Sequence, residues 1–316
     1  MCADRFRHEV LYYAEGVDGF VAGTLPFVQR ALAGEEPVLV AVGTERIAGL
    51  KEAIGDEAER VRFVDMQVLG GNPARIIPAW REFLEHHCAD GGPAFGIGEP
   101  IWPGRSPAEL LECQYHEALL NLAFDPGQAW HLLCPYDLDG LDDEVLEAAL
   151  RSHPLVAGEG ASSEPSATYS CAHEPPRPLE DPLPDPCSPF QQRTFKAEEL
   201  CSIRRFVSAW ASEELLDDER RERLILAVNE LASNSIRHGG GKGKLLVWRE
   251  SDTLLCEVRD DGHIADPLAG RRRPRVEEYG GRGLWLVNQL CDLVQVRTSP
   301  GGSVVRAHMR TDELSA

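Results

Sequence analysis

A proline-rich segment divides this chain of 316 residues into two parts. Residues 154–190 contain nine of the 22 prolines and show neither helical nor strand periodicity. Because each proline removes a backbone N–H donor and restricts φ, the segment favours extended, semi-rigid geometry over a packed element. The chain is long enough for two domains of ordinary size. We therefore predict a domain at 1–153, a linker at 154–190 and a second domain at 191–316.

The first part alternates between strand-like and helix-like segments. The candidate strands, several of them near-continuous apolar runs, are 8–14, 37–42, 61–66, 94–98 and 130–136. The candidate helices lie at about 18–33, 45–54, 73–88, 107–123 and 141–152. Strands without polar alternation are expected where helices cover both faces of a sheet. The alternation predicts an α/β fold with a doubly wound parallel sheet.

The second part has a different order of elements. Two candidate helices, at about 197–213 and 217–238, precede two strand-like segments, "KLLVWRE" and "TLLCEVRD", joined by a short turn. A glycine-rich segment, a helix near 283–291 and a final strand pair, "DLVQVRTS" and "GSVVRAHMR", follow. This order predicts an α+β two-layer sandwich, in which helices cover a mixed or antiparallel sheet.

Charge and cysteine content restrict the function classes. The formal net charge is -20, which argues against direct nucleic-acid binding, because that needs clustered lysine and arginine. The nine cysteines form no CxxC pair, so the sequence indicates neither a zinc site nor a redox motif. The sequence shows no signal peptide and no apolar stretch of about 20 residues. We therefore expect a cytoplasmic protein with reduced thiols and no membrane contact.

The predicted helix "LAVNELASNSIRH" (226–238) carries an unusual polar stripe. Glu230, Asn234 and His238 repeat every four positions, which places them on one side of a helix, roughly 130° from its apolar face. Taken alone, such a stripe is most often a solvated helix surface.

Two glycine-containing motifs downstream change that interpretation. In "VRDDG" (258–262) an apolar strand ends in Asp260, and Gly262 follows. A carboxylate at a strand end can accept the exocyclic amine of adenine, and a glycine beside it lets the base approach the backbone. In "YGGRGLWLV" (279–287) glycines open a helix, and exposed amides at a helix start form an anion site.

In this order, the three motifs resemble the ATP-binding domain shared by histidine kinases, gyrase-type ATPases and bacterial anti-sigma factor kinases, known as the GHKL type. The resemblance covers about residues 190–312 and implies bound ATP and Mg²⁺. It implies Glu230 as the general base, Asn234 as the Mg²⁺ ligand and Asp260 as the residue that reads adenine. The other binding residues that it implies are Gly262, Gly281, Arg282 and Gly283 around the nucleotide, His238 near the phosphates, and Ser303 towards adenine through water.

The chain departs from the family pattern at Ile264, where the family commonly has a second glycine. This leaves the flexibility of a lid over the nucleotide open. The segment between the two glycine motifs carries four arginines: Arg271, Arg272, Arg273 and Arg275. Two interpretations of these arginines stand side by side, a solvated basic loop and a lid that contacts phosphate or a partner.

The first part has no GxxxxGK[ST] phosphate loop after its first strand. Its most informative segment, 96–124, leaves a strand end, where doubly wound sheets bind ligands, and enters a helix. We predict pocket residues there, namely Glu99, Trp102, Arg105 and His116. A metal site of His8, Glu112 and His116 is conceivable, but a helix-surface pair and an unrelated strand histidine are favoured.

With "RHEVLYYAEG" and "GGNPARIIPAWREF", the segment resembles the sensory domain named after methanogen and methylotroph regulators, MEDS. This second resemblance covers roughly residues 5–155 and implies sensing of a small-molecule signal rather than catalysis.

Together the two resemblances imply an ATP-dependent anti-sigma factor regulator. The implied activity is serine/threonine protein kinase activity on an anti-anti-sigma partner of the STAS type, with a sigma factor as the second partner. Such a regulator is also compatible with a homodimer. A nucleotide-gated binding protein without phosphotransfer remains an alternative. An atypical sensor histidine kinase is a weaker one, because residues 190–217 carry no histidine.

Overall fold

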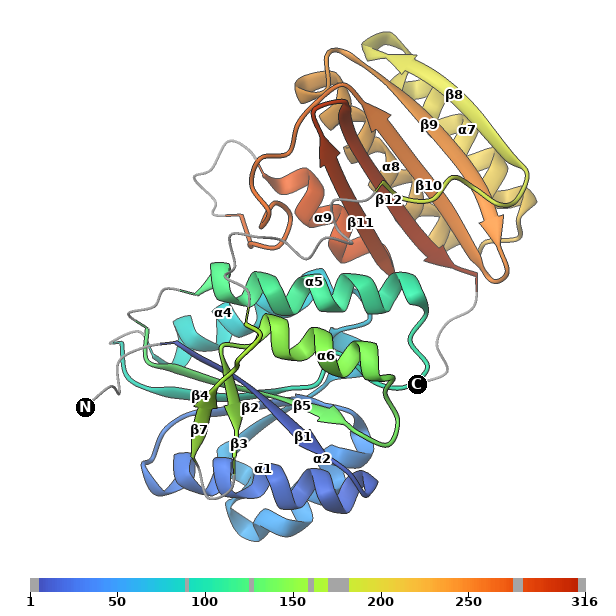
Figure 1. Ribbon diagram of the computed structural model, residues 1–316. Coiled ribbons are helices and arrows are strands. Elements are labelled where there is room, and N and C mark those ends of the chain that lie inside the picture. The colour runs from blue at the N-terminus through green and yellow to red at the C-terminus, as the bar shows by residue number, and fades with distance from the viewer. Residues whose placement is uncertain are drawn as a thin grey trace. The chain divides into compact units, whose positions relative to one another are not determined.

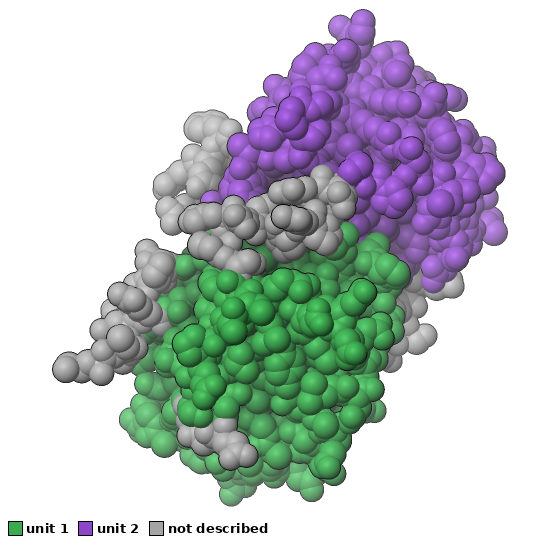
Figure 2. Space-filling model, in the orientation of Figure 1, with its two compact units in different colours: residues 1–176 green, residues 177–316 purple. Residues whose placement is uncertain are grey.

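The computed structural model describes residues 6–88, 91–124, 128–158, 162–169, 182–274 and 281–311. The chain divides into two compact units, residues 1–176 and 177–316 (Figure 2). Each unit has its own buried apolar core. Within the described residues, no helix combines the length and apolar character that crossing a membrane requires.

Unit 1 is built on a seven-stranded sheet in the order β3-β2-β4-β5-β1-β6-β7. Its strands are β1 (Arg7–Tyr13), β2 (Val38–Val42), β3 (Val61–Asp65), β4 (Ala94–Gly98), β5 (Trp130–Asp137), β6 (Leu155–Ala157) and β7 (Ser163–Pro165). All neighbouring pairs are parallel except β6 with β7. The central strands β2 and β4 are buried along their whole length, which explains their uninterrupted apolar sequences.

Helices cover both faces of this sheet. They are α1 (Gly16–Ala33), α2 (Thr44–Ile54), α3 (Met66–Leu69), α4 (Ile76–His87), α5 (Pro107–Ala123) and α6 (Asp143–Ser152), with short 3₁₀ turns at Gly55–Arg60 and Pro73–Arg75. Figure 1 shows α1 and α2 on one face and α4, α5 and α6 on the other. The start of α5 follows from sequence, because Ser106 and Glu109 form a reciprocal capping box and Pro107 is the first helical residue.

Unit 2 is a sheet covered by helices on one face (Figure 1). Its strands are β8 (Phe190–Lys196), β9 (Lys242–Glu250), β10 (Thr253–Asp260), β11 (Leu293–Ser299) and β12 (Gly302–Arg310), in the order β11-β12-β10-β9-β8. Every neighbouring pair is antiparallel. Its helices are α7 (Leu200–Glu213), preceded by a 3₁₀ turn at Ala197–Glu199, α8 (Asp218–His238) and α9 (Arg282–Leu290). The apolar residues of α7 and α8 and the inward face of the sheet form one core.

The other face of this second sheet is also partly covered. The Arg306 guanidinium lies 4.9 Å from the centre of the Trp248 ring and donates a hydrogen bond of 2.6 Å to Pro184 O. It also pairs with the fully buried carboxylate of Glu257, at 2.6 Å. The end of the proline-rich segment is therefore packed against the sheet.

The structure adds three strands to those predicted from sequence. β6 and β7 lie within the predicted linker 154–190 and extend the first sheet from β1. They are three residues each, too short for a periodic pattern, and β7 ends in Pro165 at the sheet edge, where proline is tolerated. β8 begins at Phe190 and forms the edge of the second sheet. β7 also makes the first sheet mixed rather than purely parallel.

Candidate nucleotide-binding site

Helix α8 carries the polar stripe predicted from sequence. Asp217 caps its start by accepting a hydrogen bond from the Arg220 N–H, at 2.9 Å. Glu230 and Asn234 are half-buried, and His238, the last helical residue, is exposed. The stripe is therefore partly covered by neighbouring elements instead of being a wholly solvated surface.

Asp260 at the end of β10 is held by two hydrogen bonds. The buried Ser235 hydroxyl donates to Asp260 Oδ2 at 2.5 Å, and the Gly262 N–H donates to Asp260 Oδ1 at 2.9 Å. Sequence reasoning missed Ser235. Its only signal was a hydroxyl at a position of α8 that turns towards the core.

Gly262 and Ser303 complete this corner. A methyl group added at Gly262 would lie 2.8 Å from His238 O and 2.9 Å from Asp260 Oδ1, so a side chain does not fit there. Ser303 stands opposite Asp260 in the strand register, is buried, and donates to Gly262 O at 2.9 Å. Asp260 and Gly262 are therefore joined in one hydrogen-bonded group with Ser303, which lies 41 residues beyond Gly262.

The second glycine motif lies against the stripe of α8. Gly281, with φ of 74°, precedes the first residue of α9, Arg282. A methyl group added at Gly283 would lie 3.0 Å from Asn234 Nδ2 and 3.1 Å from Glu230 Oε2. The absence of a side chain at Gly283 thus leaves the start of α9 directly beside the amide and the carboxylate.

The segment between the motifs is described only as far as residue 274, so Arg275 and Gly280 lie outside the described residues. Arg271 is 5% exposed, whereas Arg272 and Arg273 are exposed and Arg272 pairs with Asp266 at 3.3 Å. Ile264 packs against the core, and its N–H donates to Thr298 Oγ1 at 3.1 Å. The three described arginines therefore do not share one environment, because the first is buried and the next two face solvent.

These groups fit an adenine nucleotide. An oriented carboxylate and a glycine without space for a side chain match the base. An amide oxygen matches the metal, and the amides of a helix start match the phosphates. A hollow of about 390 Å³ borders Asp260 on the side of β8 and β9, but its lining contains neither Glu230 nor Asn234. The contacts of Gly283 and Asp260, rather than that hollow, therefore define the candidate site.

The residues predicted to line a pocket in unit 1 fall into separate groups. Glu99 is buried, accepts a hydrogen bond of 2.6 Å from the Tyr13 hydroxyl, and pairs with Arg46 at 3.1 Å. Burial raises the pKa of Glu99 to about 7, although Arg46 and the Tyr13 hydroxyl act in the opposite direction. Glu99 is therefore part of a charged network with β1 and α2.

Trp102 and Arg105 form a second group. The Arg105 guanidinium lies 3.5 Å from the centre of the Trp102 ring and donates to the carbonyls of Pro100 and Gly70, at 2.6 and 2.7 Å. His116 is buried within α5. These contacts explain how the side chains of Trp102 and Arg105 pack. A sensory pocket at these residues stays a prediction.

The conceivable metal site of His8, Glu112 and His116 is replaced by another arrangement. His8 contacts Glu117, one residue further along α5, at 3.1 Å, and Cys134 on β5 at 3.4 Å. His116 and Glu117 cannot both face His8, because neighbouring residues of a helix point about 100° apart.

Two family models match the chain. The model of the MEthanogen/methylotroph, DcmR Sensory domain (MEDS) matches residues 7–154, and the model of the histidine kinase-like ATPase domain matches residues 194–309. No curated protein matches the chain.

Two solved structures are distantly similar. The RsbU and RsbW domains of Rv1364c from Mycobacterium tuberculosis share 16% identity, with a TM-score of 0.31, over 39% of this chain and 32% of that chain. The Acinetobacter baumannii histidine kinase AdeS shares 14% identity, with a TM-score of 0.23, over 39% of this chain and 68% of that chain. Both likenesses are too distant to bear on function. The family models, however, agree with the geometry described above, and the chain carries a MEDS sensory domain followed by a histidine kinase-like ATPase domain.

Proposed function

We propose that the ATPase domain binds ATP with Mg²⁺ and phosphorylates a serine or threonine of an anti-anti-sigma protein, under the control of the MEDS domain. The observation that carries this proposal is the position of Gly283. A methyl group added there would lie within about 3.1 Å of both the Asn234 amide and the Glu230 carboxylate. A helix start, a metal-type oxygen and a carboxylate therefore converge where phosphates would lie.

The chemistry follows from these positions. Bound Mg²⁺ would neutralise phosphate charge, and Asn234 Oδ1 is the protein oxygen that would hold it. Glu230, one helical turn before Asn234, would accept the proton of the attacking hydroxyl. That hydroxyl oxygen forms the new bond to the γ-phosphorus as the bond to the ADP oxygen breaks. Gly281, Arg282 and Gly283 would bind the phosphates, with His238 near them.

The adenine corner would be formed by Asp260, which accepts the exocyclic amine. Ser235 and the Gly262 N–H support this assignment, because they hold the carboxylate in one orientation. Ser303 would act by fixing the Gly262 carbonyl.

The choice of a protein kinase of the anti-sigma type rests on what precedes α8. Within residues 182–213 the chain has one helix, α7, and no histidine. A sensor histidine kinase needs a helical hairpin with a phosphoacceptor histidine at that place. A STAS-type substrate and a sigma factor are therefore the partners that we propose, with a small-molecule signal acting on the MEDS domain.

Isothermal titration tests nucleotide binding. We expect the full-length protein to bind ATP with Mg²⁺ and Asn234→Ala to lose measurable binding. Asn229→Ala is the matched control, because Asn229 lies on the same helix but is bonded to Arg204 of α7. If the wild-type chain binds no nucleotide over a range of Mg²⁺ concentrations, the proposal fails.

Phosphotransfer needs a separate test. A partner captured from the native cytosol with and without ATP is incubated with labelled ATP, and the modified residue is mapped by mass spectrometry. Glu230→Gln should retain ATP binding and lose labelling, whereas Glu222→Gln on the exposed side of α8 should retain both. If control of the partner survives Glu230→Gln, the protein is a nucleotide-gated binding protein without phosphotransfer. An acid-labile phosphohistidine on the chain itself would instead establish a histidine kinase.

A further inference from the structure

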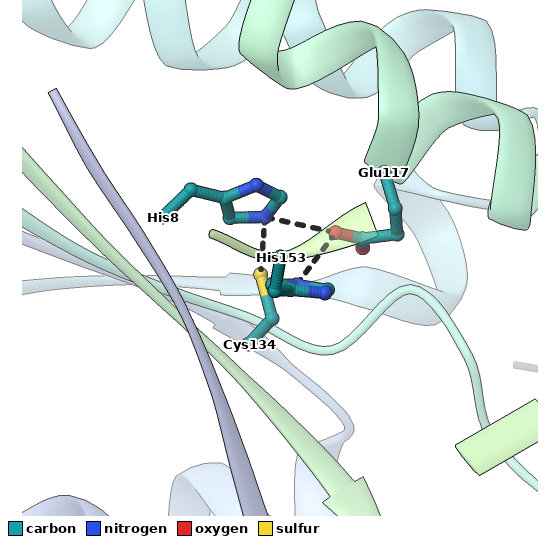
Figure 3. A group of neighbouring side chains, drawn as sticks. All are labelled: His8, Glu117, Cys134 and His153. Carbon is teal, nitrogen blue, oxygen red and sulfur yellow. Dashed lines mark hydrogen bonds and ion pairs between the residues drawn. The ribbon is translucent and has the colours of Figure 1, made fainter. Parts of the chain in front are cut away.

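Four side chains of types that can ligate a metal ion come from separate elements and meet in the core of the MEDS domain. They are His8 of β1, Glu117 of α5, Cys134 of β5 and His153, which directly follows α6 (Figure 3). Each is at most 1% exposed. One donor atom from each lies within 4.8 Å of all the others.

The contacts within this cluster centre on Glu117. Its Oε2 lies 3.1 Å from His8 Nε2 and 3.2 Å from His153 Nε2, and Cys134 Sγ lies 3.4 Å from His8 Nε2 (Figure 3). Donors about 2.1 Å from one tetrahedral ion are separated by about 3.4 Å. The observed separations are therefore close to those of a tetrahedral site.

Hydrogen bonding fixes which nitrogen of His8 carries the proton. Asn121 Nδ2 donates to the Ser152 carbonyl at 2.8 Å, so Asn121 Oδ1 is the atom that faces His8 Nδ1, at 3.2 Å. Because an amide oxygen only accepts, Nδ1 of His8 must donate. The lone pair of a neutral His8 is then on Nε2, directed at Glu117 and Cys134.

His153 is oriented in the same way. Its Nδ1 lies 2.8 Å from the Ala149 carbonyl oxygen, which again requires a proton on Nδ1. Its Nε2 and Glu117 Oε1 are buried and make no hydrogen bond among the described residues. Two imidazole lone pairs and a carboxylate thus face each other away from water. All three are hydrogen-bond acceptors, and they have too few protons between them for each to be satisfied. A cation between them resolves this conflict.

We propose that His8, Glu117, Cys134 and His153 form a binding site for a divalent transition ion of the Zn²⁺ type. Two imidazole nitrogens, a thiolate and a carboxylate suit this borderline-soft ion, whereas Mg²⁺ and Ca²⁺ prefer oxygen donors alone. The outward hydrogen bonds to Asn121 and Ala149 are the second-sphere contacts by which metal-bound histidines are usually held.

The site is closed and would have a structural or sensing role. Protein donors supply all four positions, so no position is left for a substrate or a reactive water. The ion would join two neighbouring strands, β1 and β5, to α5 and to His153, which lies two residues before β6. Metal occupancy would thereby stabilise the packing of α5 and of His153 against the sheet.

Cobalt binding tests the proposal in the full-length protein. The reduced chain is freed of metal with a chelator and titrated with Co²⁺ in the absence of nucleotide. We expect one equivalent to bind, with the intense visible bands of tetrahedral Co²⁺ and a near-ultraviolet thiolate-to-cobalt band, and we expect Zn²⁺ to displace it. Cys134→Ser should lose the thiolate band, while Cys113→Ser, an equally buried cysteine on α5, should keep it.

A second variant guards against misfolding of Cys134→Ser. Asn121→Leu leaves all four ligands in place but removes the acceptor for His8, so it should keep the thiolate band and weaken Co²⁺ binding about ten- to a hundredfold. The proposal is overturned if the folded, reduced wild type takes up no stoichiometric Co²⁺ or Zn²⁺. It is equally overturned if a folded Cys134→Ser variant keeps the thiolate band. Either result would leave the cluster as a buried hydrogen-bond network with an additional proton.

Discussion

At the scale of single residues, the proposed adenine corner depends on Ser235, which lies within the motif of α8 but outside its polar stripe. Ser235 is buried under Asp260 and donates to it, while the neighbouring Asn234 faces the glycine of α9. Two adjacent residues of one helix thus serve the two ends of the proposed nucleotide. Ser235 fixes the carboxylate that would read the base, and Asn234 faces the position of the metal.

We expect Ser235→Ala to weaken ATP binding about tenfold, because the Asp260 carboxylate loses a charge-assisted hydrogen bond and its fixed orientation. The free energy of unfolding should fall by about 1–3 kcal/mol, as expected when a half-buried carboxylate loses a hydrogen-bond donor. Calorimetric titration and urea denaturation measure the two effects. Ser233→Ala, on the same helix and only half-buried, is the control. Unchanged affinity in Ser235→Ala would exclude Asp260 from base recognition.

The raised pKa of Glu99 predicts that the stability of the sensory domain depends on pH. Burial raises the pKa of Glu99 from 4.5 to about 7, so the folded chain holds a proton that the unfolded chain releases between those two pH values. Stability from this group is complete below about pH 4.5 and is lost as pH rises through about 7, by up to about 3 kcal/mol. Glu99→Gln should therefore lose less stability than the wild type between pH 5 and pH 8.

Urea denaturation at the two pH values measures this difference. His8 and His131 act with the opposite sign, because burial lowers the pKa of each to about 4. Both histidines are present in wild type and variant, so their effects cancel in the comparison. Equal pH dependence in the two proteins would show that Glu99 is ionised throughout.

At the scale of elements, the start of α9 is the critical contact of the ATPase domain. α8 and α9 pack against each other, and Gly283 at the start of α9 faces Glu230 and Asn234 of α8. The sequence "GGRG" predicts an anion site by its composition. Only the packing of α9 on α8 places that anion site beside the carboxylate and the amide.

Gly283→Ala should reduce ATP affinity at least tenfold, because its methyl group would lie about 3 Å from both polar side chains and displace them or the helix start. Gly301→Ala is the matched control, since the nearest atom to its added methyl group lies at an ordinary 3.5 Å. Titration calorimetry compares the two variants with wild type. Equal loss in both would indicate a general effect on the domain rather than a contact with the site.

At the scale of the whole molecule, the chain consists of two units with separate apolar cores. Separate cores unfold as separate cooperative transitions unless a large interface couples them. A ligand that binds one unit then stabilises that unit alone.

We expect two transitions in differential scanning calorimetry of the full-length protein. ATP with Mg²⁺ at 100 times its dissociation constant should stabilise the ATPase unit by about 2.7 kcal/mol and leave the other transition in place. Zn²⁺ should do the reverse and raise only the transition of the MEDS unit. Asn234→Ala and Cys134→Ser, used as controls, should each abolish one response and keep the other. A single transition that responds to both ligands would show that the two units unfold together.

The sequence by itself determined most of the elements and indicated the principal residues of the candidate nucleotide site. All five strands predicted in the first part appear, and so do the helices of the second part, because their apolar periodicity and capping residues act over a few neighbouring positions. Glu230, Asn234, Asp260 and the glycines were recognisable for the same reason, since each lies in a short motif.

Tertiary structure decided what depends on contacts between distant segments. β6, β7 and β8 are stabilised by pairing with strands that lie elsewhere in the chain, so their own sequences carry little signal. Ser235 acquires its role only when β10 brings Asp260 beside α8. No motif pointed to the four-ligand cluster, whose members are spread from residue 8 to residue 153, and only His8 had been considered as a metal ligand, with other partners. They meet because parallel β1 and β5 lie side by side with α5 across them, an arrangement set by the packing of the whole domain.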